Sequence, residues 1–149
     1  MKKTAQDVVD GLSHLLADTY LLYLKTQNFH WNVTGPHFHT LHIMFEEQYG
    51  QLAAATDELA ERIRALKAKA PGSFGEFLKL TSLQEAESDV NAETMIKELL
   101  IDHESIAASL EILFKVVQED GDEVTMDMLI ERKTEHDKTA WMLRSTLEK

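Results

Sequence analysis

Cysteine is absent from the 149-residue chain, and proline occurs only twice. Without cysteine the protein has no disulfide bond, no thiolate metal site and no cysteine nucleophile. No stretch approaches the roughly 20 apolar residues that a membrane-spanning helix needs. The N-terminal sequence MKKTAQDVVDGL also lacks the apolar run of a secretory signal. These absences predict a soluble, cytoplasmic protein with no membrane segment.

Basic residues are in the minority, at 15 Lys and Arg against 26 Asp and Glu, and the formal net charge is −11. Such a charge repels nucleic acid and attracts cations. It also aids solubility, so the placement of the carboxylates has to decide what the acidity is for. Hydrophobic residues make up 44% of the chain, and its length suits one compact domain over residues 1–149.

Strand-like alternation is missing, and the apolar residues recur at helical spacing in four segments, 8–23, 38–66, 96–117 and 129–147. Thr4 is the expected N-cap of the first helix, which should end near Thr34-Gly35. Pro36 suits the first position of the second helix, and Pro71-Gly72 should stop it. Asp120-Gly121 should close the third helix.

The connections predict the topology of an all-α, ferritin-like four-helix bundle. Helices one and two are joined by a few residues, as are helices three and four, so each pair should form an antiparallel hairpin. The link between the second and third helices spans about 20 residues, from Ala70 to Asn91. One long crossover that leaves these helices parallel is the ferritin-like arrangement. We expect a short helix at 81–85 within it.

The histidines do not fit the usual di-iron site inside such a bundle. That site takes a Glu-x-x-His pair from each of two helices. None of the seven histidines has a glutamate three positions before it. If this bundle oxidises iron, the site therefore lies elsewhere.

A different set of ligand-type residues lies on one strip of the second helix: His42, Glu46, Asp57 and Glu61. The fifteen residues from His42 to Asp57 separate the two pairs by about 22 Å, whereas a metal ligand lies only about 2 Å from its ion. One helix cannot bring both pairs to one ion. A second copy, packed antiparallel about a twofold axis near Gln51, would form two sites between the subunits.

His30, at the end of the first helix, is expected to fall near His42. Imidazole and carboxylate ligands suit Fe²⁺, Zn²⁺, Mn²⁺ or Co²⁺ and do not choose among them. The alternative stays open that each of these side chains is only solvated or hydrogen-bonded. His103 and His136 fall on apolar stripes, which indicates satisfied core histidines. The remaining histidines, His14, His37 and His39, are assigned to the surface.

The run from His30 to Leu66, HWNVTGPHFHTLHIMFEEQYGQLAAATDELAERIRAL, resembles the signature of the Dps family of mini-ferritins. The His-Trp pair, the Gly-Pro turn, the histidine twelve residues after the first, and D-x-x-A-E-R-I all match. The resemblance extends over the whole chain, including V-T-M-D-M-L at the start of the fourth helix and W-M-L near the end.

The resemblance implies ferroxidase ligands at His30 and His42 of one subunit and at Asp57 and Glu61 of its twofold mate. Two irons would bind at each shared site, and zinc or another divalent metal can substitute. Glu46 stands where the family often has Asp, which leaves open whether it binds iron directly or through water. Trp31 matches a tryptophan that intercepts radicals, although packing between helices would explain it equally well.

The resemblance further implies a dodecamer that oxidises Fe²⁺, with peroxide preferred and O₂ slower, stores Fe³⁺ mineral and protects against oxidative stress. Asp122, Glu123 and Asp127 are candidates for the acidic pore through which Fe²⁺ enters. Capping of the fourth helix is the alternative role for these acids.

Two other functions remain as alternatives. The first is a DNA-compacting shell with little oxidase activity. Only Lys2 and Lys3 precede the first helix and Lys149 ends the chain, so direct DNA binding is not expected. The second is a shell without oxidase activity that serves interaction or acts as a surface antigen.

Overall fold

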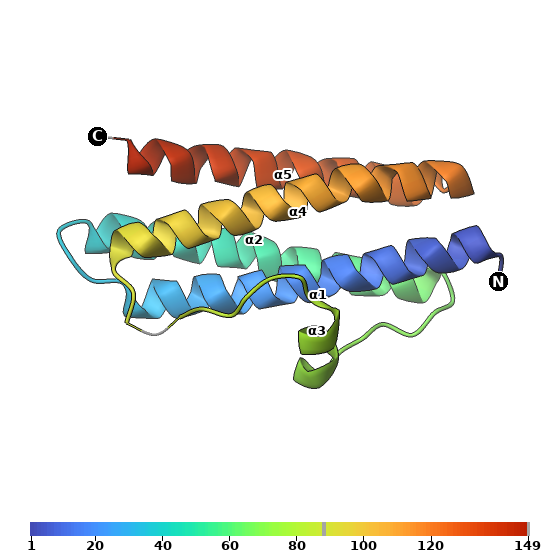
Figure 1. Cartoon of the computed structure of the whole chain (residues 1–149), viewed down its shortest axis with the longest axis horizontal. Helices are drawn as coiled ribbons and strands as arrows, with labels where there is room; N and C mark the ends of the chain where they lie inside the picture. The colour runs from blue at the N-terminus through green and yellow to red at the C-terminus, as the bar shows by residue number, and fades with distance from the viewer. Residues whose placement is uncertain (88, 149) are drawn as a thin grey trace.

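The computed structural model describes residues 1–87 and 89–148. The C-terminal Lys149, considered above for DNA binding, lies outside these ranges. This part of the chain forms five helices and no strand, as Figure 1 shows. They are α1 (Lys3–Asn32), α2 (Phe38–Ala65), α3 (Phe74–Leu80), α4 (Ala92–Asp120) and α5 (Glu123–Leu147). The predicted all-α bundle with one long crossover and a short helix is confirmed. None of the described helices is long and apolar enough to span a membrane.

The four long helices form two antiparallel hairpins, α1 with α2 and α4 with α5 (Figure 1). The crossover from 66 to 91 returns along the bundle and carries α3 on its outer side, against α1. As a result α2 and α4 run parallel. The short connections and the long link therefore give the ferritin-like arrangement that the sequence predicts.

One apolar core runs through the bundle and draws on all four long helices. Phe29 of α1, Phe45 of α2, Leu99 of α4 and Leu129 of α5 are each almost completely buried. Within each helix the buried apolar residues recur every three to four positions, which puts one stripe of each helix toward its neighbours. Burial of these stripes stabilises helices that are individually marginal in water.

Two of the expected helix starts are wrong. Lys2, not Thr4, is the N-cap of α1, and its side chain makes no capping hydrogen bond. The Thr4 hydroxyl instead donates to Asp120 Oδ1 at the far end of α4, at 2.7 Å. Pro36 lies in the turn before α2, which begins at Phe38 with His37 as its cap.

The helix α2 ends at Ala65, before the Pro71-Gly72 that was expected to stop it. Lys67 adopts a left-handed backbone conformation (φ 71°). Its N–H donates to Arg64 O, and the Ala68 N–H donates to Ile63 O. These bonds satisfy the last carbonyls of the helix, so no proline is needed to end it. Gly121 closes α4 in the same way (φ 79°), as predicted.

The short helix of the crossover was predicted at 81–85, but the structure places it at Phe74–Leu80. Ser73 and Glu76 form a capping box at its start. Ser73 Oγ accepts from the Glu76 N–H, and Glu76 Oε1 accepts from the Gly72 N–H and the Ser73 hydroxyl, so backbone donors at the helix start are satisfied by side chains. Thr81 and Ser82 are not helical because both bind the buried Asp18 carboxylate of α1.

A buried ion pair joins α1 to α4 beneath the crossover. Lys25 Nζ lies 2.9 Å from Asp102 Oδ2 and also donates to Gln84 O at 3.1 Å. The two residues are only 5% and 7% exposed. Burial raises the pKa of Asp102, and the Lys25 ammonium opposes that change. One lysine thus holds both the neighbouring helix and the end of the crossover.

Replacement of this lysine by methionine (K25M) is expected to lower the free energy of unfolding by about 3 kcal/mol, because the Asp102 carboxylate would remain buried without a cation. The double variant K25M/D102L removes both charges and should recover most of that loss. Urea denaturation of the three proteins at equal concentration measures the difference. A K25M protein as stable as the parent would show that the pair contributes nothing.

Candidate metal centre

The end of α1 and the start of α2 bring His30 and His42 together. Their rings stack with centroids 3.8 Å apart and planes inclined by 14°. Each ring is hydrogen-bonded to the other residue's backbone. His30 Nδ1 lies 2.6 Å from His42 O, and His42 Nδ1 lies 2.7 Å from His30 O. The expected proximity of the two histidines is therefore observed.

This reciprocal pairing fixes the tautomer of both rings. A carbonyl oxygen can only accept, so each Nδ1 must carry the proton and donate it. In the neutral ring the remaining nitrogen, Nε2, then has a free lone pair. A backbone carbonyl on the other ring nitrogen is a common way to orient a metal-binding histidine. Both imidazoles are thus prepared to bind a cation through Nε2.

Two aromatic side chains, to which the sequence alone assigned no role at the site, hold these rings in place. Phe38 stacks on His42 with centroids 5.1 Å apart, and Tyr49 meets the edge of His30 at 5.2 Å. Both could have been found from their spacing, because Phe38 lies four residues before His42 and Tyr49 seven after it, on the same helix face. His30 is buried and His42 half-buried, so their orientation is restricted by packing.

The three predicted carboxylates, Glu46, Asp57 and Glu61, are all exposed. Asp57 and Glu61 lie one helical turn apart. A hydrogen bond with Asp57, together with its negative charge, raises the pKa of Glu61. Two carboxylates this close repel each other when both are ionised. A divalent cation bound between them would offset that repulsion, so this pair could supply the anionic ligands of a metal site.

The imidazole pair and the carboxylate pair stay apart within the chain. Among residues 1–87 and 89–148, no three His, Asp or Glu side chains gather closely enough to hold a metal ion. Asp57 also lines a groove of about 580 Å³ between α2 and the crossover, whose walls include Ala53, Ala60 and Phe74. Phe74 is 67% exposed. The carboxylate half therefore lies beside an open, partly apolar surface.

Trp31 follows His30 directly, but its ring is 60% exposed. Packing of Trp31 between helices therefore stays a prediction. A role as a radical trap stays a prediction as well.

Of the three pore candidates, Asp122 has a structural role within the chain. It caps α5 by accepting from the Thr125 N–H and hydroxyl, and it pairs with Arg62 of α2 at 3.0 Å. Burial would raise the pKa of Asp122, but these hydrogen bonds and the guanidinium hold it below its usual range. Glu123 and Asp127 are exposed in the first turns of α5, where acids also complement the helix dipole.

His103 and His136 are core residues, as predicted, and each is 1% exposed. Their Nδ1 atoms lie 2.9 Å apart, and Arg132 Nη2 lies 3.1 Å from His136 Nε2. Because arginine can only donate, His136 must donate from Nδ1 to His103 Nδ1. His103 then carries its proton on Nε2, for which the described residues offer no partner. The expectation that both histidines are satisfied is therefore correct only for His136.

The comparisons with known proteins agree with this architecture. A family model described as a ferritin-like domain matches residues 9–149. The chain is 40% identical to DNA protection during starvation protein 2 of Bacillus anthracis, with 95% of this chain and 97% of that protein covered. The crystal structure of Dps from Staphylococcus aureus superposes with a TM-score of 0.94 at 40% identity, covering 97% of each chain. The Dps structure from Vibrio cholerae O1, whose description names ferritin-like diiron-carboxylate proteins, gives 0.93 at 31% identity over 97% of this chain and 91% of that one.

Proposed function

The chain belongs to the Dps family of ferritin-like proteins, which are mini-ferritins of iron storage and protection, and on that premise we propose that it is a cytoplasmic ferroxidase. In this proposal two subunits share each Fe²⁺ oxidation site, and a hollow dodecamer stores the Fe³⁺ product. Iron is the substrate and cargo of the protein.

One observation carries the proposal: the reciprocal hydrogen bonds of His30 and His42 use Nδ1 of each stacked ring and leave each Nε2 available for a cation. Nitrogen ligands in this arrangement suit Fe²⁺ and Zn²⁺. They need anionic partners to bind tightly, and the chain offers an exposed carboxylate pair at Asp57 and Glu61. Asp57 lies about 22 Å farther along α2 than His42.

A twofold axis near Gln51 reconciles these distances. It would place Asp57 and Glu61 of one subunit against His30 and His42 of the next, and it would do so twice in each dimer. Glu46, one turn after His42 and exposed, would supply a further carboxylate, directly or through a water molecule. The small side chains of Ala53 and Ala60 would allow two α2 helices to approach closely.

In the reaction we propose, each shared site binds two Fe²⁺ ions. Each ion gives up one electron, and one hydrogen peroxide molecule accepts both electrons as its O–O bond breaks. Transfer of both electrons together avoids release of hydroxyl radical. Hydrolysis of the two Fe³⁺ ions then gives oxyhydroxide and releases protons. The imidazoles orient the ions, and the carboxylates offset their growing positive charge. O₂ would serve as a slower oxidant, and Trp31 beside the site would intercept stray radicals.

Entry of Fe²⁺ would rely on the acids at the start of α5. Glu123 and Asp127 are free of ion pairs within the described ranges, so they are better suited to line a pore than Asp122, which caps its helix. The net charge of −11 would draw cations toward the shell.

Replacement of Asp57 by asparagine (D57N) should slow the oxidation of Fe²⁺ by peroxide about a hundredfold, since loss of a supporting contact alone costs a metal site up to this much. The rate is measured from the absorbance of the Fe³⁺ product. Glu58→Gln is the matched control, because it removes the same charge one residue along and should leave the rate unchanged. If the parent protein consumes Fe²⁺ no faster than buffer, the shell has no oxidase activity and the proposal fails.

A further inference from the structure

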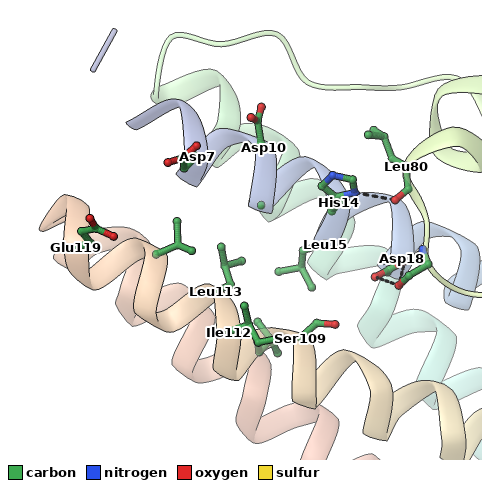
Figure 2. Close-up of a pocket in the computed structure, with 14 residues that line it drawn as sticks. Asp7, Asp10, His14, Leu15, Asp18, Leu80, Ser109, Ile112, Leu113 and Glu119 are labelled. Atoms are coloured by element: carbon green, nitrogen blue, oxygen red, sulfur yellow. Dashed lines mark hydrogen bonds between the residues drawn. The ribbon is translucent and has the colours of Figure 1, made fainter. Parts of the chain in front are cut away.

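A pocket of about 480 Å³ lies between α1, α4 and the segment that follows α3. It shares no lining residue with the proposed iron site, and its walls come mainly from residues 7–18 of α1 and 109–119 of α4 (Figure 2). Pockets of 300–1,000 Å³ are of the size that binds small organic molecules. The residues that line the pocket indicate which of these molecules it would accept.

The floor of the pocket is apolar. Leu15 of α1 and Leu110, Leu113 and Val116 of α4 contribute to it. Gly11 is what lets Leu113 pack there, since a Cβ at position 11 would come within 2.3 Å of Leu113 Cδ1. An alkyl or aryl group would lose little on entering this surface and would gain by leaving water.

The rim of the pocket is acidic, and no Lys or Arg lines it. Asp7 of α1 and Glu119 of α4 flank one end, with Leu113 and Ile112 farther along (Figure 2). Both acids are exposed, and neither takes part in an ion pair within the described ranges. The pocket lining is therefore acidic at this end, while Lys3 and Lys115 lie one helical turn from Asp7 and Glu119 outside the lining.

The other polar groups of the pocket favour a donor as well. The Asp18 carboxylate is already bound by Thr81 and Ser82, so it serves the fold. His14 Nδ1 lies 2.8 Å from Leu80 O and must donate to it, which leaves the Nε2 of the neutral ring as an acceptor. A ligand in this pocket would thus meet free acceptors at both ends and apolar carbon between them.

A bare metal ion does not fit this arrangement. No three His, Asp or Glu side chains within 1–87 and 89–148 are placed to ligate one ion, so the rim acids do not converge. We propose that the pocket binds a small amphiphilic organic cation, with its ammonium group between Asp7 and Glu119 and its apolar body over Leu15 and Leu113. This is a binding site separate from the proposed iron chemistry.

Isothermal titration of the assembled protein with octylammonium tests the proposal, with octanesulfonate as the anion of matched chain length and spermidine as a cation without an apolar body. We expect one octylammonium per chain and binding at least about tenfold weaker for the other two probes. Shortening the chain from octyl to hexyl should weaken binding about tenfold. Equal binding of the cationic and anionic amphiphiles, or no binding of the cation, overturns the proposal.

Variants then locate the site. The double change Asp7→Asn and Glu119→Gln should weaken octylammonium binding about tenfold, and Ser109→Phe should block it by filling the mouth of the pocket. Glu104→Gln removes one charge from an exposed residue of α4 outside the pocket and should change nothing. All of these residues are exposed, and thermal unfolding checks that each variant is folded. Binding that survives both changes, or that falls equally in the Glu104 variant, places the cation elsewhere and overturns the proposal.

Discussion

Co-assembly of two inactive variants is expected to restore about a quarter of the parent rate of Fe²⁺ oxidation, if each site draws on two subunits as an isologous dimer requires. One variant, H30A/H42A, lacks the imidazole half of the site, and the other, D57N/E61Q, lacks the carboxylate half. Neither should oxidise Fe²⁺ alone. In a mixed dimer one site has lost both halves while the other is intact. Random pairing makes half of the dimers mixed, which gives the quarter.

The control is a chain that carries all four substitutions, assembled with H30A/H42A. That mixture contains no intact site under any pairing and should stay inactive. Subunits are mixed by coexpression with different affinity tags, and the rate is measured on particles that contain both. No recovery in the first mixture, with both chains shown to be present, would mean that the four residues do not form a site across a subunit interface.

The helical content and topology followed from the sequence because they depend on strong, repeated signals. A three-to-four residue period over about 25 residues is hard to mistake, and a link of about 20 residues is long enough to span the bundle. The ends of the helices were less predictable. Thr4 and Pro36 are good local signals for a helix start, but Thr4 binds Asp120 of α4 instead. Such a contact exists only in the folded bundle.

The position of α3 depends both on a local sequence signal and on contacts with another helix. Ser73 and Glu76 form a capping box that the sequence contains and that could have been recognised. The sequence could not show why 81–85 is not helical, because Thr81 and Ser82 bind Asp18 from another helix. The ion pair of Lys25 with Asp102 is hidden for the same reason. Neither residue is marked as buried by its type, since lysine and aspartate are normally exposed.

At the candidate site, spacing predicted which residues share a face and how far apart they lie. It also placed His30 near His42, because a short turn joins their helices. It did not predict the reciprocal hydrogen bonds to backbone carbonyls, which depend on where each ring points. Those bonds are the feature that selects Nε2 as the free nitrogen. The sequence thus proposes which residues are ligands, and the fold indicates that each imidazole would bind the metal through Nε2.

The buried pair of His103 and His136 should make the bundle sensitive to acid. Burial lowers the pKa of His103 from 6.5 to about 3, with a smaller effect of Arg132, and burial also lowers the pKa of His136. Both rings are therefore neutral when folded at pH values where the unfolded chain protonates them. Stability is fully present above pH 6.5 and falls as the pH drops toward 3. The expected slope is about 1.4 kcal/mol per pH unit for each histidine.

The donor arrangement gives a second reason for this loss. A proton added to His103 Nδ1 would face the Nδ1 proton of His136, and a proton on His136 Nε2 would face the Arg132 guanidinium. The double variant His103→Leu and His136→Gln keeps an acceptor for Arg132 and cannot titrate. Urea midpoints measured between pH 7 and pH 5 should fall steeply in the parent and much less in this variant. His39→Gln, which removes an exposed imidazole, should keep the parent slope. If the double variant also keeps the parent slope, other groups cause the acid sensitivity and the two imidazoles do not act as buried neutral bases.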